Sequence, residues 1–139
     1  MTEADMRDGG AATGTDTSAD AAGAAAESGL GPGRRYAHVI RLRVSHAEEY
    51  LRLHREAWPE VLATITACNI RNYSIYLYGD LLFSYYEYFG SDYAADMARM
   101  AADPVTQRWW ELTDPCQEKV PEAKPGEWWA ALPEVFRHD

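Results

Sequence analysis

The chain has 139 residues, of which 47% are hydrophobic and 12% aromatic, so it is long enough for one globular core but not for two. Its formal net charge is -9, with 22 acidic against 13 basic residues, and this balance argues against nucleic acid or an anionic membrane surface as a partner. No apolar run approaches the roughly 20 residues of a membrane span, and the N-terminus shows no secretory signal. The two cysteines, Cys68 and Cys116, lack metal-ligand spacing, so we expect free thiols and a cytoplasmic location.

Residues 1–33 differ in composition from the rest of the chain. They are rich in Ala and Gly and carry six acidic residues against one basic residue, Arg7, with Leu30 as almost their only large apolar side chain. Such a segment cannot bury enough apolar surface to offset the entropy lost on ordering. We therefore expect a disordered acidic tail over 1–33 and a single folded domain over 34–139. An acidic docking arm is the alternative, which no specific feature supports.

The domain is expected to begin with a strand and a helix. In "RYAHVIRLRV" alternation places five residues on one face of a half-buried strand: Tyr36, His38, Ile40, Leu42 and Val44. Ser45 followed by Glu48 has the spacing of a capping box, which predicts a helix from about His46 toward Ala67. Pro59 predicts a kink or a short break just before it.

A hairpin and a second helix are expected next. "IRNYSIYLYGDLLFSYYEYF" alternates on both sides of Gly79-Asp80, a dipeptide that favours a tight turn between two strands. Ser91 is then expected to cap the helix "DYAADMARMAAD".

The remaining elements complete a recognisable order. Pro104 is expected to open a third helix that carries Trp109 and Trp110. "WWAALPEVF" predicts a return strand, and Pro133, which cannot donate to a neighbour, either makes it an edge strand or shifts its start. The order of strand, helix, strand, strand, helix, strand predicts an α+β, ferredoxin-like split βαβ fold. Such a sheet leaves one face uncovered, which predicts a homodimer.

One histidine stands within an apolar helical stripe. In "HAEEYLRLHREAWPEVLATI" the spacings of four and three align Tyr50, His54, Trp58, Val61 and Ile65. With an unperturbed pKa near 6.5, His54 could transfer protons at neutral pH. It could equally be a core residue that donates to a buried carbonyl, and the stripe alone leaves both interpretations open.

No other catalytic constellation is present. The chain has no Gly-rich phosphate loop, no HExxH and no GxSxG, and nothing in it requires a metal or a cofactor. Nine Tyr and five Trp would suit a pocket for a small neutral polyol. Tyr50 and Tyr73 are as easily core residues as ligands, and only one of the adjacent Trp109 and Trp110 can face fully inward. The residues alone thus indicate a small α+β dimer with an aromatic pocket and one candidate acid/base.

Five segments in order resemble the L-rhamnose mutarotase family: "EEYLRLHREAWPE", "IRNYSIYL", "LLFSYYEY", "DPVTQRWW" and "WWAALPEVF". The resemblance extends from Arg35 to Asp139. It implies a ferredoxin-like fold of the dimeric α+β barrel type. It also implies a cofactor-independent isomerase that interconverts the α and β anomers of L-rhamnose or a related deoxy sugar. By the same resemblance His54 is the proton donor, and the sugar contacts are Tyr50, Tyr73, Trp109 and Trp110.

The implied reaction leaves some questions open. His54 would give its proton to the ring oxygen, while Tyr50, Tyr73 or an ordered water serves the other oxygen. Arg55, Glu56 and Ala57 stand where members often carry Asn-Pro-Ile, a departure that could alter the sugar preferred. Two alternatives remain: another enzyme built on the same fold, such as a monooxygenase, a haem-binding enzyme or a lactone isomerase, and a sugar-binding dimer without catalysis.

Overall fold

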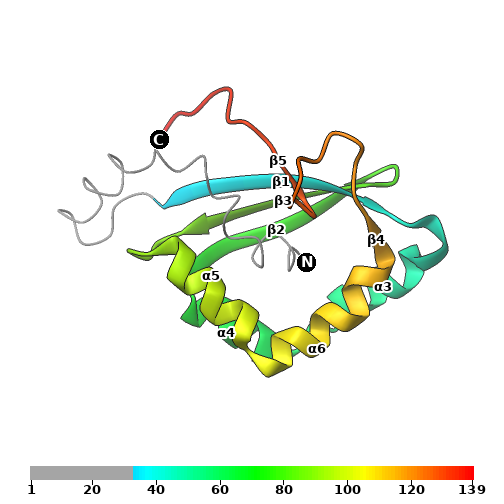
Figure 1. Cartoon of the computed structure of the whole chain (residues 1–139), viewed down its shortest axis with the longest axis horizontal. Helices are drawn as coiled ribbons and strands as arrows, with labels where there is room; N and C mark the ends of the chain where they lie inside the picture. Colours follow the sequence, from blue (N-terminus) through cyan, green and yellow to red (C-terminus); the bar gives the residue numbers. More distant parts are fainter. Residues whose placement is uncertain (1–32) are drawn as a thin grey trace.

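The computed structural model describes residues 33–139 (Figure 1), so the tail expected over 1–33 lies almost wholly outside the described residues. Within them a five-stranded antiparallel sheet has the order β2-β3-β1-β4, and β5 also pairs with β1. The strands are β1 (Arg34–Leu42), β2 (Ile70–Tyr78), β3 (Leu81–Tyr88), β4 (Gln117–Glu118) and β5 (Ala130–Ala131). This order confirms the ferredoxin-like α+β fold.

Four α-helices of the described part cover one face of the sheet, and the C-terminal segment runs over the other (Figure 1). The helices are α3 (Ala47–Arg55), α4 (Pro59–Ala67), α5 (Tyr93–Ala102) and α6 (Pro104–Thr113). None of the helices within residues 33–139 is long and apolar enough to cross a membrane.

β1 lies at the centre of the sheet and shows the predicted alternation up to Leu42. Val44 departs from the prediction, because it lies in a short 3-10 helix, Val44–His46, and is 81% exposed. The backbone N–H of Arg43 donates to the carbonyl of Cys116 (2.8 Å), and the strand ends there. The chain then turns away from the sheet toward α3.

The first predicted helix is two helices. α3 ends at Arg55 and α4 begins at Pro59, with Trp58 in extended conformation (φ -69°, ψ 130°), so the break before the proline is confirmed. The predicted capping box is wrong. Ser45 Oγ bonds His46 Nδ1 (2.9 Å) inside the preceding turn, and no side chain caps α3.

The other two helices have aspartate caps. Asp92, rather than the predicted Ser91, caps α5, and its Oδ1 accepts from the backbone N–H three residues later (3.1 Å). Ser91 lies one residue too early to reach that group. α6 begins at Pro104 as predicted, and Asp103 caps it in the same manner (2.9 Å).

The hairpin has the predicted turn. Gly79 and Asp80 join β2 to β3, and Gly79 has a φ of 63°, as the first residue of a type II′ turn requires. A bulge in β2 between Arg71 and Ser74 includes Asn72 in left-handed conformation (φ 51°).

The predicted return strand is shorter than expected. Only Ala130–Ala131 of "WWAALPEVF" pairs with β1, and Leu132 N–H adds one bond to the carbonyl of Ala37 (2.9 Å). Pro133 has no N–H to continue the ladder. The chain then extends over the sheet until Asp139 pairs with Arg35 (3.1 Å).

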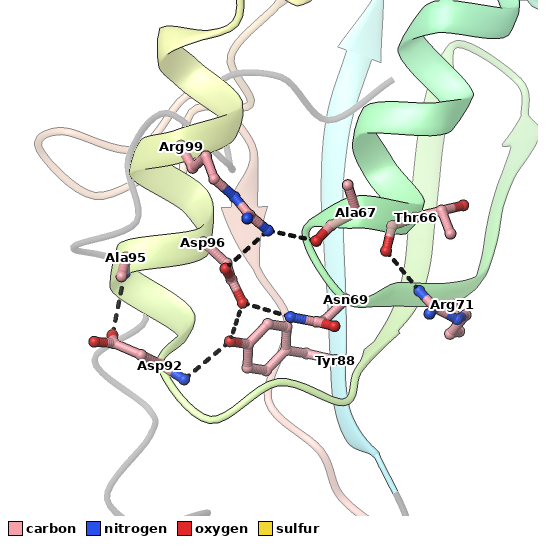
Figure 2. A network of polar contacts seen from close by, with 9 residues as sticks. All are labelled: Thr66, Ala67, Asn69, Arg71, Tyr88, Asp92, Ala95, Asp96 and Arg99. Atoms are coloured by element: carbon pink, nitrogen blue, oxygen red, sulfur yellow. Dashed lines mark hydrogen bonds and ion pairs between the residues drawn. The ribbon is translucent and has the colours of Figure 1, made fainter.

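A polar network ties the helices to the sheet (Figure 2). The carboxylate of Asp96 in α5 accepts from the hydroxyl of Tyr88 (2.6 Å) and from the amide of Asn69 (2.9 Å). Arg99 pairs with Asp96 (3.3 Å) and donates to the carbonyl of Ala67. The end of α4, the end of β3 and the start of α5 are thereby held together.

Two apolar clusters fill the space between helices and sheet. The large cluster consists of Leu53, Val61, Ile65, Cys68, Ile70, Tyr86, Tyr88, Tyr93, Met97, Met100, Trp109 and Trp110. The small cluster consists of Ile40, Leu42, Tyr50, Leu82, Cys116 and Trp129. Both cysteines are buried free thiols, which confirms that prediction.

Candidate active site

His54 lies at the boundary between the two clusters. Its ring stacks on that of Tyr50 in the small cluster (4.1 Å between centroids, 30° between planes). It also meets the ring of Trp109 in the large cluster edge to face (5.3 Å, 68°). The position one turn after Tyr50 on α3 brings these contacts together, so two of the four predicted sugar contacts touch His54.

A backbone contact fixes the tautomer of His54. Its Nδ1 lies 2.8 Å from the carbonyl oxygen of Tyr50, which can only accept, so Nδ1 carries the hydrogen. Burial lowers the pKa of His54 to about 3, although this hydrogen bond partly opposes the shift. His54 is therefore neutral at pH 7, with the lone pair on Nε2. His54 thus makes the hydrogen bond to a buried carbonyl that is expected of a core histidine. Because this bond uses Nδ1, the basic nitrogen Nε2 is the atom that could accept a proton.

The hydroxyl of Tyr50 is held by a side-chain amide. Gln117 Nε2 donates to Tyr50 Oη (3.3 Å), and Gln117 Oε1 accepts from the indole N–H of Trp128 (3.0 Å). An amide N–H can only donate, so the phenol oxygen is the acceptor and its own hydrogen points elsewhere.

The adjacent tryptophans of α6 serve different surroundings. Trp109 lies between His54 and Trp58, whose ring it meets edge to face (5.2 Å), and its indole N–H is buried with no partner among residues 33–139. Trp110 instead lines a hollow of about 340 Å³ together with Ala101, Gln107, Glu111 and Asp114. Both indoles are nevertheless buried in the large cluster, with exposed fractions of 1% for Trp109 and 3% for Trp110, so the prediction that only one of them can face fully inward is wrong.

Tyr73, the fourth predicted contact, lies on the sheet. Its half-buried ring is 5.4 Å from that of Tyr86 in the large cluster. The structure thus places His54, Tyr50 and Trp109 together, with Tyr73 on the sheet and Trp110 beside the hollow.

Four residues in or beside the two clusters were not predicted as site residues. Trp58 belongs to the helical stripe that pointed to His54, and His38 to the buried face of the first strand. Ser84 lies opposite His38 in the β1–β3 ladder, and Gln117 belongs to the two-residue β4. Of these, only Trp58 and His38 had a signal in the sequence pattern.

The described residues do not form a candidate metal site. Residues 33–139 contain no group of three or more His, Cys, Asp or Glu side chains placed to hold a metal ion. The site is built from aromatic rings, amides and a neutral imidazole.

A sequence model of the family described as L-rhamnose mutarotase matches residues 35–138. The chain belongs to the L-rhamnose mutarotase family. It is 38% identical over 109 residues to an L-fucose mutarotase of Xanthomonas campestris pv. campestris, covering 74% of this chain and 86% of that protein. It is 31% identical over 108 residues to an L-rhamnose mutarotase of Phocaeicola vulgatus, covering 76% of this chain and 99% of that protein.

A solved structure agrees with the fold. The crystal structure of an L-rhamnose mutarotase from Formosa agariphila superimposes with a TM-score of 0.59 at 20% identity, covering 76% of this chain and 99% of that chain. Membership in the family confirms the predicted class of enzyme, an isomerase that acts at the anomeric carbon of a sugar.

Proposed function

We propose that this mutarotase interconverts the α and β anomers of L-rhamnose or a related deoxy sugar such as L-fucose. The family and the names of the two relatives support a substrate of this class. The observation that carries the proposal is the neutral, oriented imidazole of His54 between the rings of Tyr50 and Trp109. Aromatic faces suit the CH-rich surface of a deoxy sugar, and an imidazole suits proton transfer at its anomeric centre.

His54 acts as the base when the ring opens. Opening a pyranose requires removal of the anomeric hydroxyl proton and delivery of a proton to the ring oxygen. Because Nδ1 carries the only ring hydrogen of neutral His54, Nε2 takes the anomeric proton first. This direction is opposite to the donor role that the family resemblance implies for the opening step. His54 becomes the donor when the ring closes.

Tyr50 supplies the proton to the ring oxygen. Its phenol oxygen accepts from Gln117, so its hydroxyl hydrogen can be directed toward the sugar. Rotation about the C1–C2 bond then presents the other aldehyde face. On closure His54 returns its proton to the anomeric oxygen, and the Tyr50 phenolate takes back the proton from the hydroxyl that becomes the ring oxygen. A positioned acid or base contributes about 10²- to 10⁴-fold to such a step.

The remaining predicted contacts bind rather than react. Trp109 offers an indole face and a buried N–H, which can donate to a sugar hydroxyl. Tyr73, which lies beside Tyr86 on the sheet, contributes a further aromatic contact to the sugar. Trp110 binds from the wall of the hollow that it lines with Gln107 and Glu111. The reaction in this proposal uses no cofactor.

The protein acts as a homodimer in this proposal. The sheet face opposite the helices exposes large side chains of β2, including Tyr76 (63% exposed) and Tyr78 (79%). The C-terminal segment crosses the same face (Figure 1) and exposes Val135 (93%) and Phe136 (80%). Apolar surface of this kind on a sheet is typical of a protein interface, and a second copy would bury it.

Saturation-transfer NMR on the anomeric protons tests the proposal. Catalytic amounts of the protein should increase magnetisation transfer between the α and β signals of L-rhamnose or L-fucose. Line broadening of the sugar without increased transfer would show binding alone and would contradict the enzymatic proposal.

A further inference from the structure

A pair of polar residues interrupts the apolar face that the sheet turns toward the helices. His38 on β1 and Ser84 on β3 lie opposite each other, and they are only 7% and 2% exposed. The next pair along the ladder, Ile40 and Leu82, belongs to the small cluster. On the other side Tyr86 belongs to the large cluster. The polar pair therefore marks the boundary between the clusters on the sheet side.

His54 marks the same boundary on the helix side. It touches Tyr50 of the small cluster and Trp109 of the large cluster. Ile75 of β2, which lies opposite Ser84, packs against both clusters. The polar pair on the sheet and His54 on α3 therefore both lie where the two clusters adjoin.

Ser84 has no structural reason to be polar. Its Oγ is buried and has no hydrogen-bond partner among the residues that the structure describes. A buried hydroxyl without a partner lowers the stability of a fold, whereas alanine at such a position would not. An orphaned group of this kind calls for a ligand or water that completes its hydrogen bonds.

His38 adds a second group that can both donate and accept. Its ring stacks on Tyr86 (5.9 Å between centroids, 20° between planes), and the ring of Tyr86 in turn lies beside Tyr73. Burial lowers the pKa of His38 to about 4, although the carboxylate of Glu127 opposes the shift, so the imidazole is neutral at pH 7. That carboxylate itself accepts from backbone N–H groups at Lys124 (2.8 Å) and Ala131 (3.3 Å).

We propose that His38 and Ser84 bind a non-anomeric hydroxyl of the sugar and so help to determine which sugar is accepted. The inference rests on the proposed function, which places the anomeric centre of the sugar at His54. A hydroxyl donates one hydrogen bond and accepts others, and serine and neutral histidine match that pattern. Discrimination follows because a sugar without the hydroxyl would leave the buried hydroxyl of Ser84 unpaired.

Two variants with a matched control test this pair. Ser84→Ala removes the hydroxyl, and His38→Phe keeps a ring to stack on Tyr86 without its nitrogens. Each should raise the KM for the preferred sugar about threefold to tenfold, the effect of one neutral hydrogen bond, with kcat nearly unchanged. Ser84→Ala should also leave the thermal midpoint unchanged or raise it. The control is Ser74→Ala, on the opposite face beside Tyr85, which should leave KM unchanged.

A series of monodeoxy sugars identifies the hydroxyl. For the sugar that lacks the contacted hydroxyl, wild type and Ser84→Ala should have equal KM values. Equal KM values for the parent sugar as well would overturn the proposal.

Direct binding titrations by NMR separate this proposal from the proposed function. If the wild-type protein binds the sugar without accelerating anomeric exchange, the proposed function fails. In that case weaker binding by Ser84→Ala supports the subsite, and equal binding overturns it. A wild-type protein that binds neither L-rhamnose nor L-fucose overturns both.

Discussion

His54 owes its orientation and its protonation state to the same contacts. The Tyr50 carbonyl holds Nδ1–H, and the neighbouring rings remove water from the imidazole and lower its pKa to about 3. A histidine in water is half protonated near pH 6.5, whereas this one is fully neutral there. His54 is therefore a base that can accept a proton throughout the neutral pH range.

The pH dependence of exchange follows from this state. A base with a lowered pKa loses activity only when the pH falls toward that pKa. After subtraction of the uncatalysed rate, kcat/KM should be flat between about pH 5 and pH 8. A histidine that must be protonated in the free enzyme, with an ordinary pKa, would instead lose activity above about pH 6.5. A measured decline of that kind contradicts the base assignment.

Tyr50 is expected to matter for kcat more than for binding. Tyr50→Phe keeps the ring that stacks on His54 and removes the proton that we assign to the ring oxygen. Exchange kinetics should show kcat lowered about 10²-fold, with KM changed only a few-fold. The control is Tyr85→Phe, which removes a phenol that donates to Glu87 on the other sheet face. If kcat of Tyr50→Phe equals that of wild type, another group protonates the ring oxygen.

The sequence could predict His54 and Tyr50 as neighbours, because both lie on one α-helical face. It could not predict that Gln117 reaches Tyr50, because 67 residues separate them and β4 is too short to show a periodicity. The pairing of His38 with Ser84 likewise depends on the register of two strands that are distant in the chain.

At the scale of single elements, the helix ends show where local patterns mislead. The pattern in the sequence favoured Ser45 and Ser91 as caps, but a neighbouring histidine takes the first hydroxyl and Asp92 caps α5. The helices, the hairpin and its turn followed from periodicity and from Gly and Pro positions. The length of the final strand did not, because it depends on how many backbone groups of β1 the segment can pair with before Pro133.

Asp92 and Ser91 form a matched pair for testing the α5 cap. Asp92→Ala should lower the free energy of unfolding by about 1 kcal/mol, because an N–H in the first turn loses its acceptor. Ser91→Ala should change it by only a few tenths of a kcal/mol. Urea denaturation followed by circular dichroism measures both, and the reverse ranking would restore Ser91 as the cap.

At the scale of the whole molecule, the exposed sheet face bears on assembly. The fold order predicted from the sequence leaves this face open, and the structure shows which side chains occupy it. Tyr76→Glu would place a charge in the proposed dimer interface and should convert a dimer into a monomer in sedimentation velocity. Glu60, exposed on α4, supplies the control Glu60→Gln. A wild-type protein that sediments as a monomer contradicts the dimer.

Stability of the whole fold should fall as the pH decreases. The pKa values of His54 and His38 are lowered to about 3 and about 4, so between these values and about 6.5 the unfolded chain binds more protons than the folded one. Each histidine can then remove up to about 1.4 kcal/mol per pH unit. Urea midpoints at several pH values should show a smaller loss for His38→Phe than for wild type. Equal slopes would show that His38 is not neutral in the folded state.

The anomeric exchange rate of His54→Asn, measured by saturation-transfer NMR with the wild type beside it, tests whether His54 transfers the proton. Asparagine can still donate to the Tyr50 carbonyl but has no basic nitrogen at the position of Nε2. We expect exchange to fall to near the uncatalysed rate while titration shows that the sugar still binds, and we expect the exposed His138→Asn to behave as wild type. Wild-type exchange rates in a folded His54→Asn protein would show that His54 does not transfer the proton.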